Sequence, residues 1–240
     1  MVQFHILGAL DLRAGAGHEV TAVLAQRRRV ALLAYLALAA PREFQHRATL
    51  VAMFSPEQDE AHGRGALRQA LHFLRRALGA DLLLTRGDEE VRLNPDACWC
   101  DATAFEAAAA AGRLEEAVRL YRGDLLIGFS LTGAPAFEDW LERRRSRLAR
   151  VYAAVLESCA TDREKRWDDT NTAEWWRQLV ARMPEDGRPV LRLMQALAAA
   201  GNRIGALLQA ERHRALLQHE FGTAPDRAIT AMVEQLRNQR

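Results

Sequence analysis

Residues 61–93 read AHGRGALRQALHFLRRALGADLLLTRGDEEVRL, and this stretch predicts a helix followed directly by a β-hairpin. Leucines recur in 61–78 at spacings of four, three and four residues, which places them on one face of a helix. Gly79 suits the C-terminal end of that helix. The apolar segments 82–85 and 91–93 then flank a short polar turn, as the strands of a hairpin do. A hairpin directly after such a helix is typical of a winged helix-turn-helix.

The face of this helix opposite the leucines carries side chains that suit nucleic-acid recognition. At about 100° per residue, this polar face points away from Leu67, Leu71, Leu74 and Leu78. Arginine can pair with guanine or phosphate, glutamine with adenine, and an aromatic ring with a thymine methyl group. The helical candidates for DNA contact are Arg64, Arg68, Gln69, His72, Phe73, Arg75 and Arg76. The alternative is a helix that is merely solvated, and the hairpin that follows disfavours it.

The turn of the hairpin carries charges of both signs. Thr85 and Arg86 are candidates for DNA contact, because a guanidinium can enter the minor groove or hold a phosphate. Asp88, Glu89 and Glu90 would repel DNA phosphates. These acids leave a second hypothesis open. In it the winged helix has weak or no DNA affinity, and the chain is a protein-interaction or ligand-sensing module.

Two nearby features each have two interpretations. Phe73 lies opposite the leucines, so either the hairpin or a partner should cover it. The run Arg27–Arg29 begins a predicted helix, where positive charge opposes the helix dipole. A phosphate contact and a structural ion pair both explain that unfavourable placement.

The rest of the chain divides into a mixed first part and a helical second part. Short apolar runs around Gly8, together with 18–23, predict a small antiparallel sheet, and helices are expected at 26–40 and 45–54. Strand signals disappear after residue 101, and helices are expected at 102–111, 114–121, 135–161, 172–183, 187–200, 204–221 and 228–238. The predicted fold is mainly α. It comprises an α+β winged helix-turn-helix domain in 1–97 and an all-α, tetratricopeptide-like helical domain in 98–240.

Composition limits the class of protein. The 240 residues are 49% hydrophobic and 27% charged, as in a folded soluble protein. The net charge is only +2, so DNA affinity requires a local patch. Neither a signal segment nor an apolar run long enough for a bilayer is found, so we expect a cytoplasmic protein without membrane contact. The three cysteines match no disulfide framework or zinc pattern, and no catalytic motif occurs, so we expect no enzyme, metal site or cofactor.

Two clusters in the second part allow simple interpretations. A tryptophan cluster could line a ligand groove, but packing between helices is favoured; its members are Trp167, Trp175 and Trp176, with Met183 nearby. The arginine run in 143–150 is most simply the solvent face of a helix. That helix would bury Trp140, Leu141, Leu148 and Val151.

Short motifs along the chain support a family resemblance. They are RRRVALLAYL (27–36), RGALRQAL (64–71), LRRALG (74–79), TRGD (85–88), VRLNPDA (91–97), YRGDLL (121–126), AFEDWL (136–141) and LAAAGN (197–202). In order and content they resemble the Streptomyces antibiotic regulatory proteins, which join a winged helix-turn-helix to a bacterial transcriptional activator domain. The resemblance implies an activator that binds double-stranded DNA at promoter direct repeats and contacts RNA polymerase through its sigma or another subunit. It also allows a homodimer, at least on DNA.

Overall fold

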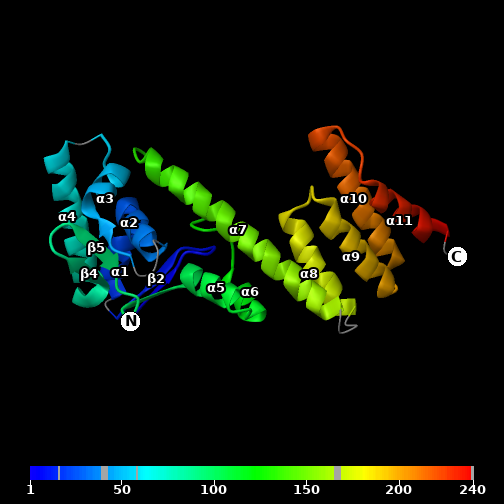
Figure 1. The fold of residues 1–240 in the computed structure, drawn as a ribbon, viewed down its shortest axis with the longest axis horizontal. Helices are drawn as coiled ribbons and strands as arrows, with labels where there is room; N and C mark the ends of the chain where they lie inside the picture. Colours follow the sequence, from blue (N-terminus) through cyan, green and yellow to red (C-terminus); the bar gives the residue numbers. More distant parts are fainter. Residues whose placement is uncertain (16, 39–42, 58, 165–168, 239–240) are drawn as a thin grey trace. The chain divides into compact units, whose positions relative to one another are not determined.

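The computed structural model describes residues 1–15, 17–38, 43–57, 59–164 and 169–238. These residues form two compact units, Met1–Arg150 and Val151–Arg240. Helices predominate and every strand is short (Figure 1), which confirms the mainly α fold class. The long helix α7 (Pro135–Glu164) contributes residues to both units. The predicted boundary between residues 97 and 98 stays a prediction.

The first sheet joins the N-terminus to a segment far along the chain. Strand β1 (Val2–His5) pairs antiparallel with β2 (Asp11–Arg13) and parallel with β6 (Cys98–Cys100). The sequence pattern does not predict β6, because three residues are too few to show a strand period. The prediction that 18–23 belongs to the sheet is wrong, because these residues lie in helix α1 (Gly17–Leu24). Val20 and Val23 are both buried there, at the i and i+3 spacing of a helix.

The winged helix-turn-helix follows in the predicted order. Its helices occupy the expected segments: α2 (Arg27–Leu38), α3 (Arg47–Phe54) and α4 (Glu60–Leu78). A 3₁₀ turn, η1 (Ala80–Leu82), leads from α4 into the hairpin. The second sheet has the order β3-β5-β4, with all pairs antiparallel, and consists of β3 (Gln45–His46), β4 (Leu83–Arg86) and β5 (Glu90–Leu93). Figure 1 shows α4 beside this hairpin.

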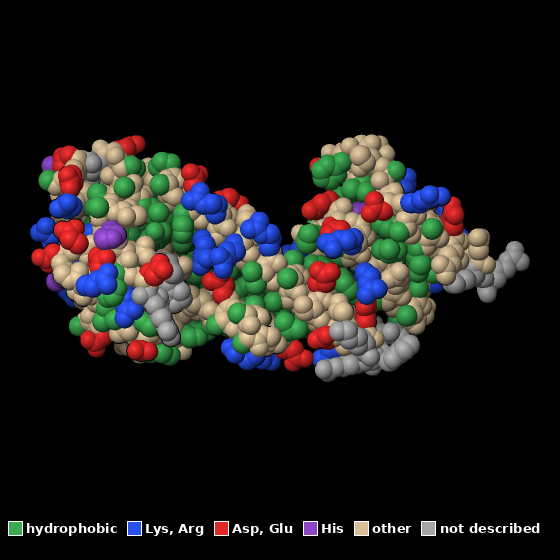
Figure 2. Space-filling view, viewed as in Figure 1, with side chains coloured by type: hydrophobic (Ala, Val, Ile, Leu, Met, Phe, Trp, Pro, Cys, Tyr) green, Lys and Arg blue, Asp and Glu red, His purple; other side chains and the backbone are tan. Residues whose placement is uncertain are grey.

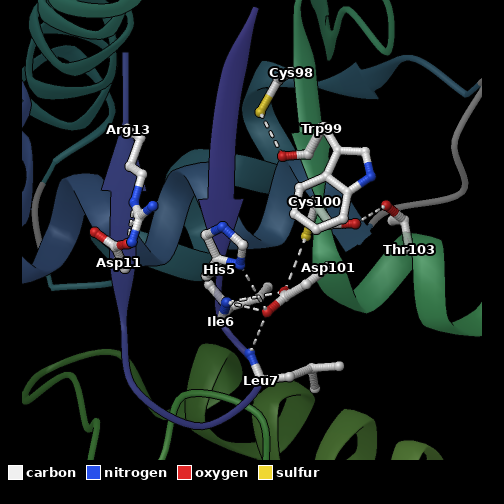
Figure 3. Close-up of polar contacts among 10 residues, drawn as sticks. All are labelled: His5, Ile6, Leu7, Asp11, Arg13, Cys98, Trp99, Cys100, Asp101 and Thr103. Carbon is white, nitrogen blue, oxygen red and sulfur yellow. Dashed lines mark hydrogen bonds and ion pairs between the residues drawn. The ribbon is translucent and has the colours of Figure 1, made fainter. Parts of the chain in front are cut away.

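The buried carboxylate of Asp101 forms hydrogen bonds with the segment that directly follows β1. Asp101 begins α5 (Asp101–Ala110) and is 2% exposed. Its Oδ1 accepts the N–H of Ile6 at 2.9 Å, and its Oδ2 accepts the N–H of Leu7 at 3.1 Å (Figure 3). Burial raises the pKa of Asp101, and these N–H donors oppose part of the rise. Because the acceptor is a carboxylate, the bonds are stronger than neutral ones.

Helix α6 (Leu114–Leu120) and the first part of α7 complete the first unit. Aromatic rings of α7 pack on the helices of the winged helix-turn-helix. The ring centroids of Tyr35 and Trp140 are 4.9 Å apart, and those of Phe54 and Phe137 are 5.3 Å apart. Segments on both sides of residue 97 therefore share one core.

Two arginines of α7 correct the prediction that the run in 143–150 is only a solvent face. Arg144 Nη2 donates to the carbonyl of Leu38, at the end of α2, at 2.9 Å. Arg145 donates at 2.9, 2.8 and 3.0 Å to three carbonyl oxygens, those of Leu125, Leu126 and Phe129. Buried backbone carbonyls need such partners when no helix or sheet provides them. The exposed arginines of the run are Arg143, Arg147 and Arg150.

The second unit is built from successive helices that pack on one another. They are the end of α7 followed by α8 (Asp169–Arg182), α9 (Gly187–Ala199), α10 (Arg203–Phe221) and α11 (Arg227–Asn238). Gly201, with φ of 77°, makes the tight turn between α9 and α10. Asn202 then caps α10 by accepting the N–H of Gly205 at 2.8 Å. This arrangement confirms the tetratricopeptide-like prediction.

Of the tryptophans in this unit, Trp176 packs between helices, and Trp175 is half-buried. Trp176 is buried and donates its Nε1–H to Glu164 Oε1 at 2.8 Å. Arg192 lies over the same ring, 5.5 Å from its centroid. These contacts support core packing over a ligand groove, and Trp167 lies outside the described residues. In the described part of the chain, no helix is both long and apolar enough to cross a membrane.

Candidate nucleic-acid interface

Helices α3 and α4 approach closely because Gly63 stands where they meet. A Cβ at that position would lie 2.6 Å from Val51 Cγ1, so with a larger residue either the Val51 side chain or the helices would have to shift. Asp59 caps α4 by accepting the N–H of His62 at 2.9 Å, and this bond is the main reason that the pKa of Asp59 is lowered. The buried residues Leu67, Leu71 and Leu74 then fix which face of α4 points outward, as predicted.

The outward face of α4 carries most of the predicted DNA-contacting residues, and we call it the recognition surface. Its exposed side chains are Arg64, Arg68, Gln69, His72 and Arg76. Arg64 pairs with Glu60, one turn earlier, at 2.6 Å. The side chains of Arg68, Gln69 and His72 form no hydrogen bond or ion pair with any other described residue. Gly65 leaves this surface open, since nothing lies within 4 Å of a Cβ built there.

Phe73 and Arg75 are half-buried, and the structure places both apart from the recognition surface. The guanidinium of Arg29 lies 3.5 Å from the centroid of the Phe73 ring. Neither the hairpin nor a partner is therefore needed to cover that ring. Arg75 Nη2 donates to the carbonyl of Leu83 at 3.3 Å, which ties α4 to β4. Both side chains support the fold of the domain.

The run Arg27–Arg29 has a structural role that neither predicted alternative describes. Arg27 Nη1 donates to the carbonyl of Ser130 at 2.8 Å, and its guanidinium lies 5.5 Å from the Phe129 ring. Arg29 covers Phe73 and donates to the carbonyl of Ala22 at 3.3 Å. One expectation for this run was an ion pair with a carboxylate. Arg27 and Arg29 instead contact aromatic rings and carbonyl oxygens. Arg28 is exposed.

The hairpin places Thr85 and Arg86 at its exposed end. Gly87 adopts φ of 57° at the turn, a conformation that glycine tolerates. Nε of Arg86 donates to Oε2 of Glu90, and this hydrogen bond raises the pKa of Arg86 and lowers that of Glu90. Asp88 and Glu89 are exposed in the turn. The acids of this hairpin, which forms the wing of the winged helix-turn-helix, therefore differ. Glu90 is hydrogen-bonded to an arginine, whereas Asp88 and Glu89 have no such bond within the described part of the chain.

Sequence reasoning missed Phe44 and His46, which lie on the outer face of the second sheet. The Phe44 ring lies 4.9 Å from the guanidinium of Arg86 and 4.8 Å from that of Arg92. His46 Nε2 is 3.5 Å from Glu90 Oε1. Only the pairing of β3 with β5 brings these residues to the hairpin, and a two-residue strand gives no signal in the sequence. Asp59 could have been found as a capping residue, since it directly precedes α4.

This chain matches a family model, and it also matches a solved structure. The model of the bacterial transcriptional activator domain matches residues 100–237. The structure is that of Mycobacterium tuberculosis EmbR in complex with a low affinity phosphopeptide, with a TM-score of 0.62 and 20% identity. The match covers 100% of this chain and 65% of that chain, so this chain spans about two thirds of the EmbR chain. At this identity the likeness concerns the fold alone.

No curated protein matches the chain. The family model covers more than half of the 240 residues, including every helix from α5 to α10. The chain therefore belongs to the bacterial transcriptional activator domain family of transcriptional regulators, which confirms the resemblance to the Streptomyces antibiotic regulatory proteins.

Proposed function

We propose that this chain is a sequence-specific DNA-binding activator of transcription whose helix α4 lies in the major groove. The recognition surface is the observation that carries the proposal. Its residues project from a helix that buried leucines and a capped N-terminus hold in place. Arg68, Gln69 and His72 have no partner among the described residues, so their donors and acceptors are available to base edges and phosphates. Thr85 and Arg86 would add a contact from the wing.

The proposed division of labour follows the predicted boundary. Residues 1–97 would bind DNA, and 98–240 would form the activator domain that contacts RNA polymerase through its sigma or another subunit. Family membership supports the second assignment. Promoter direct repeats would bind more than one copy, so a homodimer on DNA is part of the proposal. Such a regulator acts in the cytoplasm and carries out no catalysis.

Selection of genomic DNA fragments by the purified protein tests the proposal. We expect enrichment of a shared sequence and an affinity that falls with salt, because each phosphate contact releases counterions. The test variant is Arg68→Ala on α4. Its matched control is Arg143→Ala, which removes an exposed arginine of α7. Only the first should lower enrichment. Retention of random fragments, or an equal loss of enrichment in both variants, would contradict specific recognition by α4.

A second candidate function is a protein-interaction module with little DNA affinity. The observation in its favour is the exposed pair Asp88 and Glu89 at the wing tip, where DNA phosphates would be repelled. The same selection separates the two functions. A protein-interaction module would retain no specific fragment at low salt, whereas the proposed activator would.

A further inference from the structure

The outer face of the second sheet gathers charged side chains in one row across three strands. Glu90 on the central strand β5 is directly opposite His46 on β3 and Arg86 on β4. Residues directly opposite each other in antiparallel strands project to the same side of the sheet. Val91, the next residue along β5, is fully buried and points to the other face. The row of His46, Glu90 and Arg86 therefore faces outward.

Arg86 is held at two points within this row. Its Nε–H donates to Oε2 of Glu90, which is 13% exposed. Its guanidinium lies 4.9 Å from the ring centroid of Phe44. The Arg86 side chain as a whole is nevertheless 68% exposed. Among the described residues, the two terminal amino groups of Arg86 have no hydrogen-bond partner.

A guanidinium held in this way suits a phosphate. Arginine has five N–H donors in a fixed plane, and the bond to Glu90 uses only the one on Nε. The remaining four lie on the terminal nitrogens, the geometry that binds two phosphate oxygens at once. The ring of Phe44 and the carboxylate of Glu90 restrict the plane of the group before any ligand arrives. Less side-chain freedom then remains to be lost on binding.

We propose that Glu90 and Phe44 are positioning residues that hold Arg86 ready for a DNA phosphate at the wing. This inference rests on the proposed DNA binding. It separates Glu90 from Asp88 and Glu89, which lie in the same turn and hold no arginine in the described structure. The negative charge of Glu90 is already offset by Arg86 and, at 3.5 Å, by the ring nitrogen of His46 when that is protonated. Its repulsion of DNA is correspondingly small.

The test compares variants that keep or remove each point of support, using an oligonucleotide duplex that carries the selected sequence. Glu90→Gln removes the charge but keeps an oxygen that accepts the Nε–H, so affinity should stay within about twofold or rise. Glu90→Ala and Phe44→Leu should each weaken binding by roughly three- to tenfold, the cost of ordering one long side chain. Glu89→Ala is the matched control and should not weaken it. Circular dichroism checks that each variant is folded.

The same changes in an Arg86→Ala background separate positioning from a general effect on the sheet. Phe44 also supports Arg92, so its substitution needs this background. With Arg86 absent, Glu90→Ala and Phe44→Leu should have little further effect, because the group that they position has been removed. Effects that persist in full in this background would overturn the positioning role.

A second measurement does not depend on DNA. The Nε–H signal of Arg86 in a nitrogen-15 NMR spectrum should be protected from exchange in the unmodified protein and in Glu90→Gln, and should be lost in Glu90→Ala. Equal exchange in all three would overturn the proposal. If the unmodified protein binds no DNA, the proposed function fails and the phosphate role fails with it. If it binds DNA but Glu90→Ala binds as well as Glu89→Ala does, only the positioning role fails.

Discussion

Helices α4 and α7 are both rich in arginine, yet the first unit uses the two sets in opposite ways. On α4, Arg68 and its neighbours on the recognition surface extend into solvent. On α7, Arg144 and Arg145 reach back to carbonyl oxygens of other segments. Arginine side chains do gather on the viewed side of α7 (Figure 2), but they are the exposed part of a partly internal set. A run of arginines in a sequence therefore does not reveal whether it binds a partner or the protein itself.

The largest effect should come from removing the part of the first unit that follows residue 97, which includes α5, α6 and the first part of α7. A fragment of residues 1–97 lacks Asp101, strand β6 and the arginines of α7, whereas a fragment of residues 1–150 keeps the whole first unit. The shorter fragment leaves the N–H groups of Ile6 and Leu7 without their carboxylate. It should be several kcal/mol less stable, since lost buried polar partners cost about 1 to 3 kcal/mol each. Urea unfolding followed by circular dichroism measures the difference, and equal midpoints would show that residues 98–150 do not stabilise the first unit.

A single arginine of α7 should have the next largest effect. Arg145→Ala removes one donor from each of three carbonyl oxygens, although that of Leu126 keeps the N–H of Phe129 at 3.0 Å. The side chain of Arg145 is only 24% exposed. We expect a loss of about 2 to 4 kcal/mol in the free energy of unfolding, because hydrogen bonds to charged groups contribute most. Arg143→Ala, two residues earlier and exposed, should stay within about 0.5 kcal/mol of the unmodified protein. Similar stability in both variants would remove the distinction between the two helices.

The arginines of α4 should behave in the opposite way. Arg68→Ala and Arg76→Ala should each weaken specific DNA binding by about 1 to 3 kcal/mol where the side chain contacts a base, and by less where it holds only a phosphate. The stability of Arg68→Ala should be nearly unchanged, since that residue has no partner among those described. Arg75→Ala supplies the contrast, because its bond to Leu83 supports the fold. Titration of the selected duplex measures the affinities. Unchanged affinity in both Arg68→Ala and Arg76→Ala, with folding intact, would exclude the recognition surface.

The sequence predicts α4 well because every fact needed lies within the helix itself. The spacing of Leu67, Leu71 and Leu74 alone decides which residues face outward. The sequence does not predict the partners of Phe73 and Arg145, because folding brings those partners near from other segments. Arg29 covers Phe73 from another helix, and the carbonyls held by Arg145 belong to a loop between helices. Pattern within one element gives its exposed face, whereas contacts between elements depend on packing that no local period records.

The smallest expected effect concerns the acids at the wing tip, and it refines the comparison at the level of single charges. Asp88 and Glu89 are exposed and hold no arginine among the described residues, so near DNA they act mainly through repulsion of phosphates. Asp88→Asn and Glu89→Gln should each tighten binding by a few tenths of a kcal/mol up to about 1 kcal/mol at low salt. The gain should shrink as salt rises, because exposed charges are screened within about 10 Å at 0.1 M. Sequence preference should change little, since contacts to the backbone carry little information about bases.

Arg86→Ala should do the reverse at the same wing, weakening binding and lowering the slope of affinity against salt by about 0.9, the value for one phosphate contact. Glu234→Gln, which neutralises an exposed acid on α11, serves as the control for a general change in net charge and should leave DNA affinity where it was. If neutralising the turn acids weakens binding or leaves it unchanged at low salt, the hairpin does not approach DNA. The exposed charges of the wing would then face a protein partner, and α4 alone would carry the contact with DNA.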